Sequence, residues 1–171
     1  LWGMFKKVVI ADTIGPIVDT IFSGQLSFGG ITLILGVFYF AVQIYCDFSG
    51  YSDIAIGTAK LFGIKLMSNF KFPYFSRDIG EFWRRWHISL STWFRDYLYI
   101  PLGGSRAGNI LSIRNIFIIF LVSGLWHGAN LTFIAWGFFH AVLFIPLFVL
   151  KTNRKHLNNN IANNTLLPSL K

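Results

Sequence analysis

The strongest constraint on the fold is the absence of formal charge from residues 131–150, which follow a second apolar segment at residues 115–126. An α-helix rises about 1.5 Å per residue, so the longer segment can cross the hydrocarbon core of a bilayer. A short Trp-His-Gly-Ala-Asn sequence that contains His127 separates the two segments. We therefore expect a membrane-embedded helical hairpin with an ionisable side chain at its turn. Ionisable groups are costly inside a bilayer, which makes His127 the first functional candidate.

The composition predicts an all-α integral membrane protein. Of the 171 residues, 54% are hydrophobic and 13% are charged, against about 25% charged in soluble domains. The net charge of +8 does not indicate nucleic acid, because the Lys and Arg residues are spread between apolar segments and suit anionic lipid headgroups. The single Cys46 excludes an intrachain disulfide, and no paired-histidine metal motif occurs, so no metal site is expected.

The remaining segments predict one further span and several interrupted elements. Residues 28–46 are uncharged and suit a transmembrane helix, whereas residues 8–22 contain two carboxylates and a proline and suit an interfacial or broken helix. Residues 47–53 contain two carboxylates with neighbouring Ser and Gly; paired acids could do acid–base work, but this composition is more typical of a segment that caps and turns the chain. We assign residues 1–150 to one membrane core and residues 151–171, rich in Asn, to a polar disordered tail. Because the sequence begins without Met or a signal-peptide pattern, we expect an internal fragment of a longer chain.

A basic amphipathic helix is predicted over residues 78–100, where aromatic and apolar residues recur every three or four positions. Asp78 and Glu81 have the spacing of a capping box and mark its start. The basic residues on and beside its polar face are Arg84, Arg85 and Arg95, which flank His87. Arginines can bind the phosphate groups of an acyl donor through bidentate hydrogen bonds. The alternative is a helix that lies on lipid headgroups and binds no substrate.

Two histidines are candidates for acid–base chemistry, and each has a structural alternative. Neutral imidazole, with an unperturbed pKa of about 6.5, can take a proton from a hydroxyl that attacks an activated carbonyl. His127 is the best candidate for this base, although it could instead only hydrogen-bond a neighbouring helix. His87 could act beside a bound phosphate or could be an interfacial residue. His140 lies among Phe and Leu residues and is expected to be a core histidine.

Positive charge at both ends of the hairpin predicts its orientation. The basic residues that flank it are Arg106, Arg114, Lys151, Arg154 and Lys155. Cytoplasmic ends of membrane helices carry an excess of Lys and Arg, so both ends are expected on the cytoplasmic side. The turn with His127 would then lie near the midplane or on the far side of the membrane.

Five ordered motifs resemble the membrane-bound O-acyltransferase (MBOAT) family. They are residues 43–57 (QIYCDFSGYSDIAIG), 69–75 (NFKFPYF), 81–97 (EFWRRWHISLSTWFRDY), 99–104 (YIPLGG) and 123–130 (SGLWHGAN). Within the family, the chain is most similar to the bacterial branch that contains the alginate O-acetylation protein. The resemblance covers about residues 1–150 and implies a multi-span helical bundle, with interfacial or re-entrant amphipathic helices around a central tunnel.

The resemblance also implies an activity and roles for individual residues. The characteristic histidines of the family match His127, the expected catalytic base, and His87. Arg84, Arg85 and Arg95 would bind the donor, and Trp86, Trp126 and Asn130 would shape the tunnel. The expected donor is acetyl-CoA, with no bound cofactor, and the expected acceptor is a hydroxyl of an extracytoplasmic polysaccharide. A bacterial inner-membrane location, contact with membrane lipids and a second, extracytoplasmic acetyltransferase as partner are implied in the same way.

Two alternatives remain open at this stage. The family resemblance also extends to D-alanyl transfer to teichoic acid, with a carrier protein as donor. A non-catalytic transporter or scaffold would use the histidines only for proton relay or helix packing. A relay would need intramembrane carboxylates in series with the histidines, and residues 127–150 contain none.

Overall fold

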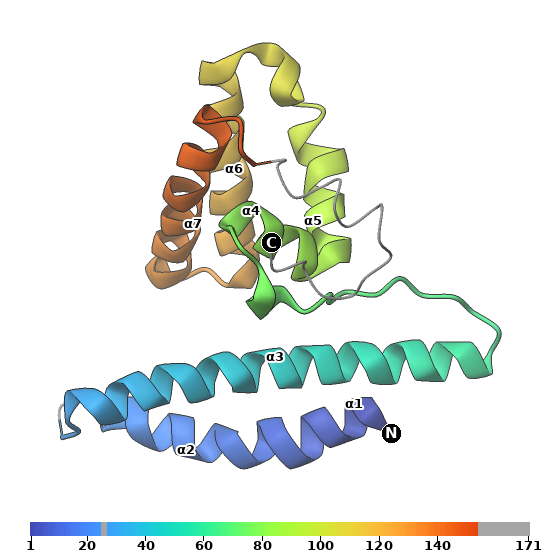
Figure 1. The fold of residues 1–171 in the computed structure, drawn as a ribbon. Helices are drawn as coiled ribbons and strands as arrows, with labels where there is room; N and C mark the ends of the chain where they lie inside the picture. Colours follow the sequence, from blue (N-terminus) through green and yellow to red (C-terminus); the bar gives the residue numbers. More distant parts are fainter. Residues whose placement is uncertain (25–26, 154–171) are drawn as a thin grey trace. The chain divides into compact units, whose positions relative to one another are not determined.

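The computed structural model describes residues 1–24 and 27–153, and these residues form helices, turns and loops without a β-strand. They divide into two compact units, one of Leu1–Asn69 and one that begins at Phe70. Figure 1 shows the helices of each unit. Most of the tail predicted to be disordered, residues 154–171, lies outside the described residues.

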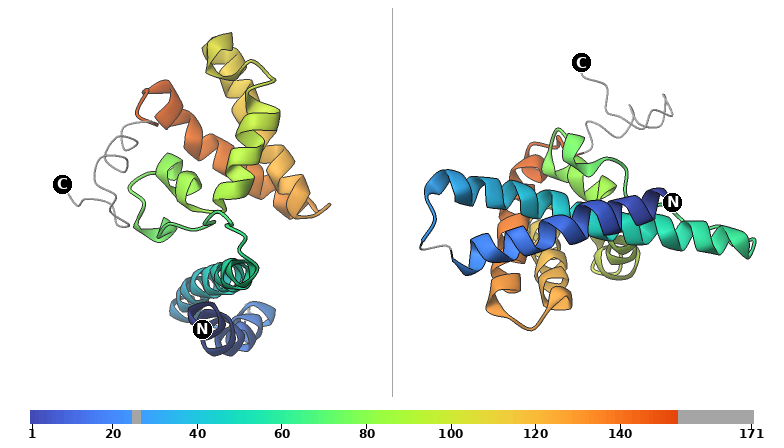
Figure 2. Two further views of the ribbon diagram at one scale, coloured as in Figure 1. Left: turned by 90° about the vertical axis from the view of Figure 1, so that its right-hand side faces the viewer. Right: turned by 90° about the horizontal axis from the view of Figure 1, so that it is seen from below.

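The first unit is a pair of long helical rods. The first rod contains α1 (Trp2–Met4), a π-helical segment η1 (Phe5–Ala11) and α2 (Asp12–Ser23), and the second is α3 (Gly30–Leu61). The rods lie side by side and antiparallel (Figures 1 and 2). A Cβ added to Gly3 would lie 2.6 Å from the carbonyl oxygen of Gly50, so glycine at this position lets the two backbones approach.

Helix α3 is longer than the sequence pattern predicted. Residues 47–53 do not turn the chain but continue the helix to Leu61, because their polar side chains face partners on the first rod. The Lys6 ammonium lies 2.8 Å from the Asp53 carboxylate and donates to the Ser49 hydroxyl at 2.9 Å. Lys7 bridges Asp12, at 2.6 Å, and Asp47, at 2.7 Å. Paired charges of this kind allow an apolar helix to include carboxylates.

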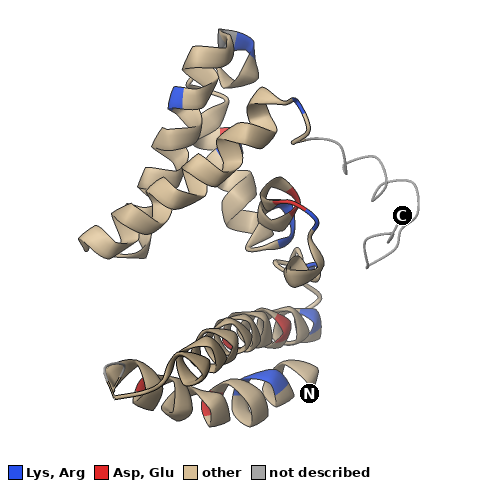
Figure 3. Ribbon diagram, turned by 60° about the vertical axis from the view of Figure 1, so that its left-hand side comes forward, with Lys and Arg blue, Asp and Glu red and all other residues tan. Residues whose placement is uncertain are grey.

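The second unit contains short helices followed by a long hairpin. Its elements are η2 (Pro73–Phe75), α4 (Ile79–Arg85), α5 (Ile88–Phe94), η3 (Arg95–Tyr99), η4 (Gly104–Ala107), α6 (Asn109–His127) and α7 (Leu131–Val149). The predicted hairpin is confirmed: α6 and α7 pack together along their length and α7 carries no Lys, Arg, Asp or Glu (Figures 1 and 3). Added Cβ atoms at Gly124 and Gly137 would clash with the carbonyl oxygens of Phe133 and Phe120, so close backbone contact fixes this pair.

The amphipathic segment is not the single helix that was predicted over residues 78–100. It breaks at Trp86–His87 into α4 and α5, and continues as the π-helical turn η3. The break follows from packing: the Trp86 ring lies 5.1 Å from Phe70 and 5.7 Å from Phe82, measured between ring centroids. The predicted N-cap is confirmed, since the Asp78 carboxylate accepts from the Glu81 amide at 2.7 Å.

Three helices of the described chain are long and apolar enough to cross a membrane: α3, α6 and α7. Many of their apolar side chains are exposed, including Ile31 at 79% and Phe139 at 65%. Exposure on this scale is typical of surfaces that contact lipid. The all-α membrane fold predicted from composition is therefore confirmed.

Candidate active site

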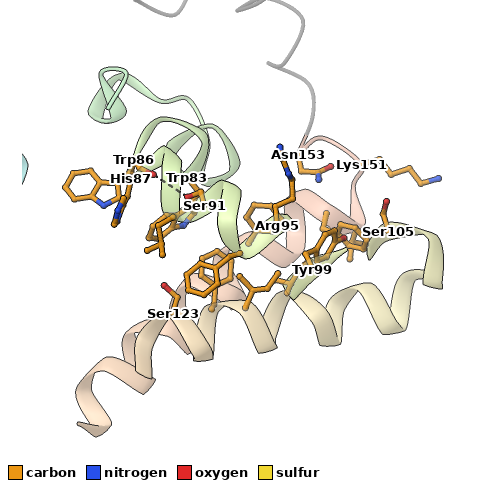
Figure 4. Close-up of a pocket in the computed structure, with 18 of the residues that line it drawn as sticks. Trp83, Trp86, His87, Ser91, Arg95, Tyr99, Ser105, Ser123, Lys151 and Asn153 are labelled. Carbon is orange, nitrogen blue, oxygen red and sulfur yellow. Dashed lines mark hydrogen bonds between the residues drawn. The ribbon is translucent and has the colours of Figure 1, made fainter. Parts of the chain in front are cut away.

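A cavity of about 480 Å³ lies within the second unit, lined by side chains from α4, α5, η3, α6 and α7 and from the segments that flank the hairpin. Its two ends differ in chemistry. His87, Ser91 and Ser123 lie at one end, and Arg95, Tyr99, Ser105 and Lys151 lie toward the other (Figure 4). His127 also lines the cavity, and its ring and that of His87 both lie next to Trp126. The wall between the ends is aromatic and aliphatic. The cavity therefore joins a cationic end to a pair of imidazoles.

Both imidazoles predicted to be functional line this one cavity, although forty residues separate them in the sequence. His127 is the last residue of α6, and its ring lies 4.9 Å from the ring of Trp126 and 5.1 Å from that of Trp136. The His87 ring lies 5.9 Å from the same Trp126 ring. Trp126 thus contacts both imidazoles, and the hairpin turn and the helix break are held next to each other.

His87 has an unusual backbone. Its φ of 44° and ψ of 57° place it in the left-handed region, which non-glycine residues adopt at a cost of about 1–3 kcal/mol. This conformation breaks the helix and brings the imidazole to the cavity wall. Burial lowers the pKa of His87, and the neighbouring His127 lowers it further. His87 is therefore uncharged at neutral pH.

Arg84 and Arg85, which were predicted to bind the donor, do not line the cavity. Arg85 is 4% exposed and contacts the Glu81 carboxylate at 3.0 Å and the Lys71 carbonyl at 3.0 Å. Arg84 donates to the Asn153 carbonyl at 2.8 Å, and burial lowers its pKa. These contacts tie α4 to the segments around it, which favours structural roles for both guanidinium groups.

Glu81, fully buried, organises this cluster. Its carboxylate accepts from the Arg77 side chain at 3.1 Å and from the Arg77 amide at 3.0 Å, besides its contact with Arg85. Burial alone would raise the pKa of Glu81, but the hydrogen bonds from Arg77 and the charges of both arginines lower it to about 2. The glutamate thus accepts from both the backbone and the side chain of Arg77.

The remaining residues predicted for the site differ in whether they line the cavity. Arg95 lines the cavity and contacts Asp96 at 2.7 Å, and Trp86 also lines it. Trp126 contacts the imidazoles but is not part of the cavity wall, and Asn130 caps α7 by accepting from the Thr132 amide at 3.1 Å. Among the described residues, no group of three or more potential ligands could hold a metal ion.

Sequence reasoning missed Ser123, Tyr99 and Lys151 as parts of the cavity wall. Ser123 could have been found, because it precedes His127 by four residues and so shares its helix face. Lys151 was treated only as a topology signal. Tyr99 is the last residue of a π-helical turn that the periodicity of the segment does not reveal.

The chain matches the family model of the membrane-bound O-acyltransferases over residues 6–158. It is 54% identical to a probable alginate O-acetylase of Pseudomonas fluorescens over 140 residues, which cover 82% of this chain and 28% of that protein. It is 47% identical to a peptidoglycan O-acetyltransferase of Helicobacter pylori, covering 82% of this chain and 27% of the relative. A teichoic acid D-alanyltransferase of Streptococcus thermophilus is 37% identical, covering 82% of this chain and 36% of the relative.

The chain thus spans under a third of the two O-acetyltransferases that it matches. The match nevertheless includes α3, the whole cavity-forming unit up to Asn153 and both histidines. Since the family model covers most of the chain and agrees with the membrane helices, the chain belongs to the membrane-bound O-acyltransferase family.

Proposed function

We propose that the full-length protein transfers an acetyl or similar short acyl group to hydroxyls of an extracytoplasmic polysaccharide, of the alginate or peptidoglycan type. The observation that carries this proposal is the placement of His87 and His127 at one end of a cavity whose other end is cationic. Higher identity to the two O-acetyltransferases than to the D-alanyltransferase supports an acetyl group as the cargo.

In this proposal His127 is the general base. It takes the proton of the acceptor hydroxyl as that oxygen adds to the carbonyl carbon of the acyl donor, and it returns the proton to the departing thiolate. General base catalysis of this kind contributes about 10²- to 10⁴-fold. His87, uncharged at neutral pH, can donate or accept one hydrogen bond from the opposite wall and so orient the donor.

The donor is proposed to be acetyl-CoA, with its phosphates at the cationic end of the cavity. Arg95 supports this role because its guanidinium lines the cavity while Asp96 holds its Nε and one Nη. Trp86, on the same wall, would contact the thioester arm. We propose Arg95 and Trp86 as donor contacts, whereas the partners of Arg84 and Arg85 favour a structural contribution.

The location and partners follow from the same chemistry. A bacterial inner membrane would place the basic ends of α6 and α7 on the cytoplasmic side, where acetyl-CoA is available. A polysaccharide acceptor outside the membrane would then need a second, extracytoplasmic acetyltransferase to complete transfer. The membrane lipids themselves contact the exposed apolar faces of α3, α6 and α7.

The test uses membranes that contain the full-length protein and the second acetyltransferase, with labelled acetyl-CoA and purified envelope polysaccharide, and bound acetate is the readout. Arg95→Gln should raise the KM for acetyl-CoA by about 10-fold or more, since a hydrogen bond to a charged group contributes about 1.5–3 kcal/mol. Arg84→Gln is the matched comparison. A raised KM in Arg84→Gln with an unchanged KM in Arg95→Gln would move the donor site to α4. No acetate on any polysaccharide would overturn the proposed activity.

A further inference from the structure

Ser123 places a hydroxyl on the cavity wall, at the end that contains His87 (Figure 4). Ser123, on α6, is 6% exposed and lines the cavity, and its hydroxyl makes no hydrogen bond with any residue in the described part of the chain. The hydroxyl can therefore donate its hydrogen to an acceptor atom of a ligand in the cavity.

The position of Ser123 relates it directly to the proposed base. Ile116, Phe120, Ser123 and His127 follow at spacings of four, three and four residues, and all of them line the cavity. Residues four apart on a helix have Cβ atoms about 5–6 Å apart. The hydroxyl of Ser123 is therefore one helical turn from the imidazole of His127, on the same face. The carbonyl group at which the acyl donor and the acceptor hydroxyl react would lie within reach of both the Ser123 hydroxyl and the His127 imidazole.

Two other donors lie on the same wall. The Ser91 hydroxyl lies 3.4 Å from the Trp86 carbonyl oxygen, to which it donates (Figure 4). The indole nitrogen of Trp83 has no hydrogen-bond partner in the described chain, but its ring is held by contacts with Phe120, Trp136 and His140. Ser123 is thus the hydroxyl best placed to meet a new acceptor atom.

We infer that Ser123 donates its hydroxyl hydrogen to the carbonyl oxygen of the bound acyl thioester and stabilises the oxyanion. This inference rests on the proposed acyl transfer. The acceptor oxygen adds to the carbonyl carbon, and its proton passes to His127. The carbonyl oxygen gains the negative charge, next to the Ser123 hydroxyl. When the C=O bond re-forms, the C–S bond breaks and the thiolate leaves with the proton from His127.

The experiment compares full-length wild type with Ser123→Ala, using acetyl-CoA as donor and release of free thiol as readout. Loss of one oxyanion donor lowers kcat by about 10²- to 10³-fold. We expect a decrease in kcat of this order with a KM for acetyl-CoA within about twofold of wild type, since the contact strengthens only as charge develops. Ser123→Thr, which keeps a hydroxyl, should recover part of the rate.

Ser112→Ala is the matched control on the same helix. Ser112 is fully buried, but its hydroxyl donates to the Gly104 carbonyl at 3.1 Å, outside the cavity wall. We expect this variant to lower thermal stability while kcat per folded protein stays near wild type. If Ser123→Ala behaves like Ser112→Ala, the role of Ser123 is structural and the inference is overturned.

Two further outcomes separate this inference from its alternatives. A kcat of Ser123→Ala within about threefold of wild type overturns it, because an oxyanion donor must affect the barrier. An acetyl adduct in the intact mass of wild type that is absent from Ser123→Ala also overturns it, since Ser123 would then be a nucleophile. If wild type and His127→Ala are both inactive, the proposed acyl transfer fails. If only His127→Ala is inactive, acyl transfer holds, and the Ser123→Ala result decides this inference by itself.

Discussion

The two units of the protein use ionisable side chains in opposite ways. In the first unit, Lys6 and Lys7 are ion-paired with carboxylates at 2.6–2.8 Å. In the second unit, His127 makes no ion pair with any described residue, and its neighbours include the rings of Trp126, Phe133 and Trp136. Paired charges hold helices together, whereas an imidazole among aromatic rings keeps its proton-accepting nitrogen for a reaction partner.

The second unit contains both arrangements within a short distance along the chain. Glu81 and Arg85 form a buried ion pair in α4, and His87 follows two residues later at the cavity wall. The pair fixes the helix, and the break after it presents the imidazole. The Glu81–Arg85 pair therefore supports the imidazole end from outside the cavity, whereas Arg95 and Lys151 lie toward the other end of its wall (Figure 4).

The comparison predicts the largest effect for His127→Ala. Acyl transfer by the full-length protein should fall by about 10²- to 10⁴-fold, because a general base is lost. Thermal stability should stay near wild type, because the His127 side chain is exposed at the end of α6. The measurement is bound acetate per folded protein, with membrane abundance and thermal unfolding recorded in parallel.

His140→Ala is the control for this prediction. Its half-buried ring lies 4.5 Å from Trp136 and 5.0 Å from Trp83, so truncation removes packing between α4 and α7. We expect lower thermal stability and a loss of activity proportionate to the loss of folded protein. If His127→Ala shows this pattern instead, or keeps most of its specific activity, the base is another residue.

The next largest effect is expected for Glu81→Gln, which sharpens the contrast between supporting and reacting groups. The substitution leaves Arg85, 4% exposed, without its charged partner. Removal of one member of a buried pair is destabilising by about 3–5 kcal/mol. Thermal unfolding in detergent measures the loss. A Glu81→Gln variant with wild-type stability would show that the pair contributes no net stabilisation.

The same substitution predicts a change in pH dependence. The pKa of Glu81 is lowered from 4.5 to about 2 in the fold. A lowered carboxyl pKa contributes stability above the unfolded value, and this stability is lost as the pH falls from 4.5 toward 2. Wild type should lose stability across this window, and Glu81→Gln should show a flatter profile. Equal slopes of stability against pH in wild type and Glu81→Gln would contradict the assignment of this pH dependence to Glu81.

The parts predicted correctly from the sequence depend on local rules. The α6–α7 hairpin is predicted by two successive apolar segments, the second of which is long and uncharged. The Asp78 N-cap is predicted by the ability of its side chain to accept from a backbone amide at a helix start. The family resemblance selects His87 and His127 as candidates, but only the structure shows that they line one cavity, because no spacing rule brings together residues that lie so far apart in the chain.

The parts that were missed depend on tertiary contacts. Aromatic periodicity continues through the break at His87, and only the packing of Trp86 against Phe70 and Phe82 reveals where α4 ends. Arg85 and Arg95 have the same sequence signature, but burial separates an ion-paired arginine from one at the cavity. Partners on the first rod likewise extend α3 through Asp53.

The smallest effects are expected in the first unit, where the two members of one ion pair should differ. The Lys6 side chain is 8% exposed, and that of Asp53 is 38% exposed. Asp53→Asn leaves a buried ammonium with neutral acceptors, the Ser49 hydroxyl and the new amide oxygen, in place of a carboxylate, which we expect to be destabilising by about 2 kcal/mol. Lys6→Met leaves a solvated carboxylate and an apolar chain of similar length, so its effect should be about 1 kcal/mol or less.

The double variant Lys6→Met with Asp53→Asn tests the source of this asymmetry. It removes both charges, so it should recover most of the stability lost in Asp53→Asn, because no ammonium is left buried. Thermal unfolding of the full-length protein measures all three variants, and acetyl transfer per folded protein should stay near wild type in each. Equal destabilisation by the two single variants would show that the difference in burial between Lys6 and Asp53 has no effect on stability. A specific loss of transfer would give the Lys6–Asp53 pair a part in the reaction, and the contrast between the two units would no longer hold.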